Sequence, residues 1–127
     1  MWRFRSPKAA KQQFLDAHPE QSDSDFLLEC GIIGECRKAI AIRNAIASLG
    51  GVEPGRIHAS DTFNTDLINI EFWGSLDAIA VVYELEKNLG TTIPESQAER
   101  IPNPELHHQM TVADFVIAVL EIVDNSI

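Results

Sequence analysis

One serine of this chain stands where its hydroxyl could do chemistry. Ser75 follows Gly74 and opens the run SLDAIAVVYELEKNLG, which has the apolar spacing of a helix and stops at Gly90. A serine at a helix N-terminus can act as an N-cap, because its oxygen accepts hydrogen bonds from free backbone N–H groups. The same position can also hold a hydroxyl out for modification. Both interpretations are open on these residues alone.

An enzyme built around Ser75 would need a general base within hydrogen-bond reach of the hydroxyl. Asp77 is two residues further along the predicted helix and therefore lies on a different side of it. No Asp, Glu or His of the chain falls in a recognised catalytic spacing. We therefore predict that the protein is not an enzyme. A pocket that unites Ser75 with His58 would argue against this prediction.

The residue types that bind metals do not fall in a familiar metal-binding pattern. Cys30 and Cys36 are six positions apart, which is not a zinc-type spacing. We expect both to stay reduced and to act as small hydrophobic residues of the core. His107 and His108 lie among prolines and amides without obvious co-ligands. The sequence therefore predicts no metal site.

The composition is typical of one globular domain: of 127 residues, 45% are hydrophobic and 23% are charged. The net charge is −9, although residues 1–11 hold four bases and no acid. An acidic body repels nucleic acid and attracts basic protein surfaces, so we expect no nucleic-acid partner. No apolar run is long enough for a membrane span, and the basic N-terminus lacks the apolar core of a secretory signal. We expect a cytoplasmic protein.

The apolar periodicity predicts an all-α fold, because no stretch alternates with the period of a strand for long enough. Residues 1–25 are expected to be an N-terminal extension with a short helix, and residues 26–127 a helical domain. The expected elements of that domain are a long helix from Phe26 to Leu49, broken near Gly31–Gly34, a long loop over 52–74, a helix over 75–89, a short helix or turn over 94–99 and a last helix after Thr111. Thr111 and Asp114 have the spacing of a capping box.

The helix predicted over 75–89 carries two apolar stripes on opposite sides. The first stripe is Leu76, Ile79 and Tyr83, and the second is Val81, Leu85 and Leu89. A four-helix core requires one stripe from each helix. The other stripe is left for a partner, for a ligand tail or for the protein's own extension, whose aromatic residues are Trp2, Phe4 and Phe14.

The segment GSLDAIAVVYELEKNLGTTIP resembles the second-helix region of the acyl carrier protein family, which includes the peptidyl carriers. The positions that match without a gap are Ser75, Leu76, Asp77, Leu85, Glu86, Leu89, Ile93 and Pro94. A weaker likeness covers residues 35–123. The chain departs from the family pattern at Gly74, where the family usually has Asp, and residues 1–25 and 102–109 are additions to it.

The resemblance implies a four-helix acyl-carrier-like bundle with a long loop between its first two helices. In this family a phosphopantetheinyl transferase attaches 4′-phosphopantetheine to the motif serine, here Ser75, and the arm then holds an acyl chain as a thioester. Such carriers serve fatty acid or polyketide biosynthesis and are usually monomers. Acyl-loading and acyl-using enzymes with basic surfaces are the implied partners. The implied partner-binding residues are Leu76, Asp77, Ile79, Tyr83 and Glu86.

A carrier-like fold that lacks the arm is the alternative. Gly74 motivates it, because the aspartate that the family usually has there helps to hold the magnesium of the transferase. Such a protein would act as a protein-binding or scaffold module through the same helix.

Overall fold

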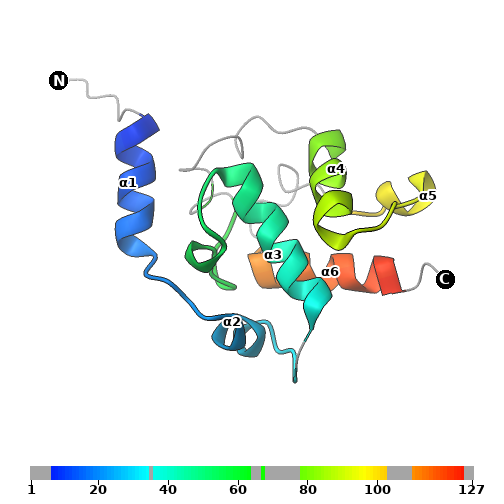
Figure 1. The fold of residues 1–127 in the computed structure, drawn as a ribbon, viewed down its shortest axis with the longest axis horizontal. Coiled ribbons are helices and arrows are strands. Elements are labelled where there is room, and N and C mark those ends of the chain that lie inside the picture. The colour runs from blue at the N-terminus through cyan, green and yellow to red at the C-terminus, as the bar shows by residue number, and fades with distance from the viewer. Residues whose placement is uncertain (1–6, 35, 64–66, 68–77, 103–109, 125–127) are drawn as a thin grey trace.

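The computed structural model describes residues 7–34, 36–63, 67, 78–102 and 110–124 (Figure 1). Its elements are α1 (Pro7–Ala17), α2 (Asp23–Glu29), α3 (Arg37–Gly50), the 3₁₀ helix η1 (Pro54–Arg56), α4 (Ala78–Leu89), α5 (Glu95–Ala98) and α6 (Val112–Asp124). All regular elements in these ranges are helical, which confirms the all-α class for this part of the chain. None of these helices has the length and apolar character that crossing a bilayer requires.

Helix α3 is the central element of the fold. It contacts α2, η1, α4 and α6, and in Figure 1 it runs diagonally across the middle of the molecule with α6 behind it. Fully buried side chains from three helices form the core, namely Ile42, Ala45 and Ile46 of α3, Leu85 of α4 and Phe115, Val116 and Val119 of α6. The apolar spacing of each helix thus supplies one face to a shared interior.

The long helix expected from residue 26 onward is divided into α2 and α3. Gly31 and Gly34 separate the two helices with φ angles of 79° and 85°. A side chain at either position would be strained, because L-residues rarely adopt positive φ. The predicted break near Gly31–Gly34 is therefore present. Helix α2 begins after Ser22, whose Oγ accepts a 3.1 Å hydrogen bond from the Asp25 N–H.

The loop that follows η1 docks onto the first turn of α6. The carbonyl of Asp61 accepts from the Val112 N–H at 2.8 Å, and that of Ala59 accepts from the Ala113 N–H at 2.9 Å. Helix α6 also has the predicted capping box. The Asp114 N–H donates to Thr111 Oγ1 at 3.1 Å, and the Thr111 N–H donates to Asp114 Oδ2 at 3.2 Å.

The helix expected within the N-terminal extension is α1, and it folds back onto the body. Phe14 is buried with 4% of its surface exposed, and His18, just beyond the helix, is buried as well. Arg56 of η1 places Nη1 3.0 Å from the carbonyl oxygen of His18 and so donates to the end of this segment. Trp2 and Phe4, the other aromatic residues expected to provide cover, lie outside the described ranges.

A buried arginine joins α3 to the segments around it. The Arg43 side chain is 1% exposed, and its guanidinium carbon lies 4.3 Å from the centre of the Phe26 ring. Its hydrogen bonds run to the carbonyls of Ile57 (2.9 Å), Gln21 (2.9 Å) and Gly55 (3.3 Å) and to Asp23 Oδ1 (3.1 Å). Burial lowers the pKa of the guanidinium, and the nearby Asp23 carboxylate opposes this shift. The charge is thus held by acceptors from two parts of the chain, residues 21–23 and residues 55–57.

Replacing Arg43 with leucine is expected to lower the free energy of unfolding by about 3–5 kcal/mol, because buried carbonyl groups lose their donors. Urea denaturation followed by circular dichroism measures this loss. The matched control is Arg37→Leu, since Arg37 is exposed on the same helix. That variant should stay within about 0.5 kcal/mol of the wild type. Equal losses in the two variants would show that the Arg43 hydrogen bonds contribute little.

Candidate functional site

The two stripes of the helix after Ser75 have different environments, as the sequence predicts. Val81 and Leu85 of α4 face the core and are 4% and 1% exposed. Ile79 and Tyr83 are 80% and 65% exposed. The stripe that contains Val81 and Leu85 therefore packs in the core. The described part of the N-terminal extension does not cover Ile79 and Tyr83 of the other stripe. Ser75, Leu76 and Asp77 lie outside the described residues.

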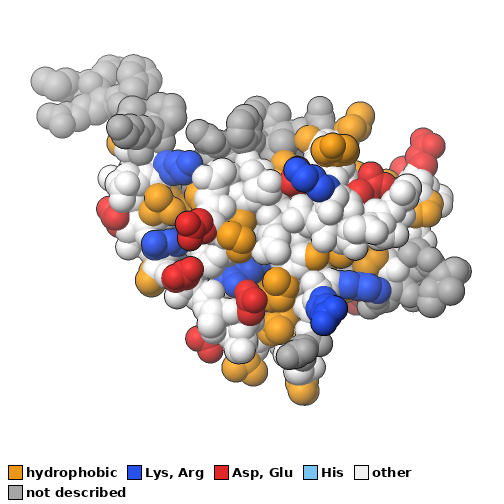
Figure 2. Space-filling view, in the orientation of Figure 1, with side chains coloured by type: hydrophobic (Ala, Val, Ile, Leu, Met, Phe, Trp, Pro, Cys, Tyr) orange, Lys and Arg blue, Asp and Glu red, His pale blue; other side chains and the backbone are white. Residues whose placement is uncertain are grey.

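Helices α4 and α5 border an open groove next to the exposed stripe. Its apolar lining is Ile79, Val82, Tyr83 and Ala98, and its acidic lining is Glu86, Glu95 and Glu99. Figure 2 shows hydrophobic side chains at the surface over α4 and acidic side chains toward α5. The groove thus combines an apolar floor with a negative rim. Such a surface suits a partner with an apolar contact and a basic surround.

Glu86, for which the family resemblance implies a role in partner binding, also shapes this groove. Its carbonyl accepts from the Gly90 N–H at 2.9 Å, which ends α4, and its Oε2 accepts from the Ile93 N–H at 2.7 Å. Ile93 is buried, so the carboxylate ties the turn after α4 to the core. Glu86 therefore helps to position α5 beside α4.

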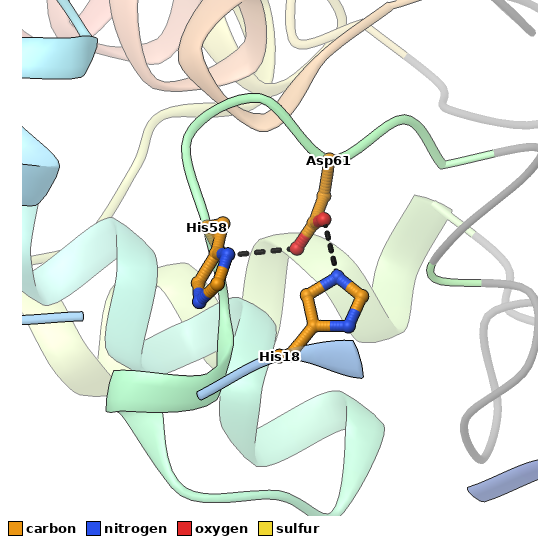
Figure 3. A group of neighbouring side chains, drawn as sticks. All are labelled: His18, His58 and Asp61. Carbon is orange, nitrogen blue, oxygen red and sulfur yellow. Dashed lines mark hydrogen bonds and ion pairs between the residues drawn. The ribbon is translucent and has the colours of Figure 1, made fainter. Parts of the chain in front are cut away.

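A second group of side chains with chemical potential lies on other elements. His18, His58 and Asp61 each bring one ligand-type atom to within 4.8 Å of the others (Figure 3). His18 Nε2 lies 2.6 Å from Asp61 Oδ1, and the backbone N–H of His58 donates to Asp61 Oδ2 at 2.9 Å. The two imidazole rings have their centres 4.9 Å apart. His18 and Asp61 are buried, and His58 is half-buried.

Sequence reasoning missed this cluster. His58 and Asp61 are three positions apart in a segment that the sequence predicts as a loop, and this spacing is the one local signal. His18 is 43 positions before Asp61 and reaches it because α1 folds back onto the body. The sequence predicts no metal site, and the other two histidines, His107 and His108, lie outside the described residues. Ser75, which a catalytic pair with His58 would require, lies outside the described residues.

The two cysteines lie at the edge of the core rather than inside it. Cys30 and Cys36 are free, are half-buried and pack against buried hydrophobic residues. Burial raises the pKa of the Cys30 thiol to about 11, and the neighbouring Glu29 carboxylate adds to this effect. The Cys30 thiol is therefore neutral near pH 7 and a weak nucleophile.

Comparisons with protein-family models, with curated proteins and with solved structures gave no match to this chain. The acyl carrier likeness therefore depends on the residues that carry it, above all those from Gly74 to Pro94. The geometry of α4 and α5 is a separate observation on the same segment.

The two faces of α4 should respond differently to truncation. Leu85→Ala is expected to lower the free energy of unfolding by about 2–5 kcal/mol, because it leaves a cavity in the core. Ile79→Ala removes an exposed side chain and should change stability by no more than about 0.5 kcal/mol. Chemical denaturation of both variants measures the difference. A large loss for Ile79→Ala would mean that the stripe is covered in solution.

Alkylation of Cys30 should be slow and should speed up as the pH rises toward 11. In a Cys36→Ser variant at pH 8, iodoacetamide should modify the folded protein roughly 100-fold more slowly than the same chain in denaturant, where the thiol titrates near its ordinary value. Intact mass spectrometry over time gives both rates. Equal rates in the folded and unfolded protein would contradict the assigned environment.

Proposed function

We propose that the protein is an acyl carrier protein that holds an acyl chain as a thioester on 4′-phosphopantetheine attached to Ser75. The observation that carries the proposal is the exposed pair Ile79 and Tyr83 on the helix that follows this serine. A helix that carried Ser75 only as an N-cap would have no need of a large apolar outer face. A carrier does need one, because it must be recognised in turn by several enzymes.

The order of the elements supports the same function. A long helix (α3) is followed by a long connection, by α4, by the short α5 and by α6. This is the arrangement that the family resemblance implies for a four-helix carrier. In this interpretation α1 and α2 precede the carrier bundle and pack on its first helix and on the loop after it.

The charges around the groove suit the partners that the proposal requires. Glu86, Glu95 and Glu99 line the groove together with the apolar residues Ile79, Val82 and Ala98 and with Tyr83. Basic surfaces on acyl-loading and acyl-using enzymes would be attracted to this rim, and the apolar residues would be buried on contact. Electrostatic attraction of this kind speeds encounter more than it strengthens a complex. Fast encounter with weak final binding suits a carrier, because it must leave each enzyme after the reaction.

The position of the serine also suits the attachment of a phosphodiester. Ser75 stands three positions before Ala78, the first described residue of α4. The free N–H groups and the dipole of a helix N-terminus favour an anion there. The arm would then raise the local concentration of its acyl group at each partner's active site.

Intact mass spectrometry after incubation with coenzyme A and a broad-specificity phosphopantetheinyl transferase tests the proposal. The wild type should gain the mass of one phosphopantetheine, and Ser75→Ala should gain none. Ser96→Ala is the matched control, since Ser96 is an exposed serine on α5 and its loss should leave the modification unchanged. A known carrier treated in parallel confirms that the transferase is active.

The alternative function is a carrier-like module that binds proteins without an arm, and Gly74 is the residue that favours it. If the control carrier is modified and the wild type is not, the carrier proposal fails for that transferase. Partner binding that survives Ser75→Ala and is lost in Tyr83→Asp would then support the protein-binding module.

A further inference from the structure

Three residues around the docked N-terminal helix are arranged as metal ligands. His18 follows α1, and His58 and Asp61 belong to the loop that follows η1. Figure 3 shows the Asp61 carboxylate between the two histidines. Imidazole nitrogen and carboxylate oxygen are the donors that Zn²⁺ and similar divalent transition-metal ions accept in proteins.

The backbone fixes which nitrogen of each histidine carries a proton. His18 Nδ1 lies 2.7 Å from the carbonyl oxygen of Phe14, and His58 Nε2 lies 2.7 Å from that of Pro19. A carbonyl oxygen can only accept, so each of these nitrogens must be the N–H donor. In the neutral rings the lone pairs are then on His18 Nε2 and His58 Nδ1. Hydrogen bonds from a metal-binding histidine to a backbone carbonyl are the usual outer partners of such ligands.

The contact between His18 and Asp61 requires a positive charge. With the lone pair on Nε2, the 2.6 Å approach to Asp61 Oδ1 brings two acceptors together. Either a proton or a metal ion must lie between them. Both side chains are buried, so solvent screens the pair weakly.

We propose that His18, His58 and Asp61 form a binding site for one Zn²⁺ ion. His18 Nε2, His58 Nδ1 and Asp61 Oδ1 are the protein ligands, and a water molecule that reaches the half-buried edge at His58 is the fourth. On binding, the proton shared by His18 and Asp61 is released to solvent. Tetrahedral coordination at about 2.0–2.2 Å places ligand atoms about 3.4 Å apart. Small side-chain rotations should reach this spacing, since one ligand-type atom of each residue already lies within 4.8 Å of the others and the 2.6 Å contact between His18 and Asp61 can open.

The site would join separate parts of the fold. His18 brings the N-terminal segment, while Asp61 accepts through its backbone oxygen from the first turn of α6. The backbone N–H of His58 orients the Asp61 carboxylate through Oδ2, and Oδ1 is the oxygen that faces His18 Nε2. Zn²⁺ would therefore hold α1 against the loop that supports α6. This role is independent of the function proposed for Ser75.

Isothermal titration of the metal-stripped wild type with Zn²⁺ tests the site. We expect one ion per chain, with affinity at least tenfold weaker in His58→Gln and in Asp61→Asn. His58→Gln is the primary variant, because this side chain is half-buried and its backbone N–H remains to hold Asp61. The matched controls are the double variants His107→Ala/His108→Ala and Cys30→Ser/Cys36→Ser, which remove the other histidines and both thiols and should bind within twofold of the wild type.

A measurement on the unaltered protein complements the variants. Addition of Zn²⁺ should shift the imidazole NMR signals of two of the four histidines, assigned to His18 and His58, and leave those of His107 and His108 in place. The proposal is overturned if the wild type binds no Zn²⁺, if His58→Gln binds as tightly as the wild type, or if either control double variant loses the ion. Shifts confined to His107 and His108 would overturn it as well.

Discussion

A guanidinium inside a helical core must find acceptors, and this requirement organises much of the fold. The Arg43 side chain is almost fully buried and is bonded to carbonyls of Gln21, Gly55 and Ile57. These groups belong to the entrance of α2 and to the segment around η1, which are far apart in the sequence. An uncompensated charge would cost several kcal/mol, so the two segments must stay against α3. The central helix thus positions the chain before and after it through one side chain.

The η1 segment and the loop after it also contact the segment after α1 and the first turn of α6. Arg56 donates to the carbonyl of His18, and Asp61 accepts from His18 and from the first turn of α6. The loop after η1 is therefore a meeting point for α1, α3 and α6. Its hydrogen bonds explain how residues 57–63 are held in place without regular structure. They also explain why the histidine and aspartate side chains meet there.

The groove beside α4 requires exposed side chains, whereas the histidine cluster requires buried ones. Leu85 and Val81 anchor α4, which leaves Ile79 and Tyr83 facing outward, and Glu86 ties the following turn to the core. A recognition surface of this kind depends on exposure. The cluster of His18, His58 and Asp61 depends on burial, because its polar atoms are close and weakly screened. The two sites share no residue and can be altered separately.

The sequence alone determined the features that depend on neighbours along the chain. The helical class, the break at Gly31–Gly34, the capping box at Thr111 and the two faces of α4 follow from local propensity and from the 3.6-residue period. Only the tertiary structure decided which polar side chains are buried and which groups they contact. Arg43 has the side chain of a surface residue, yet its position on α3 faces the interior, and His18 meets Asp61 because α1 folds back. The periodicity of a helix predicts which of its sides is apolar. The partner of a buried charge depends instead on which distant segment packs against it.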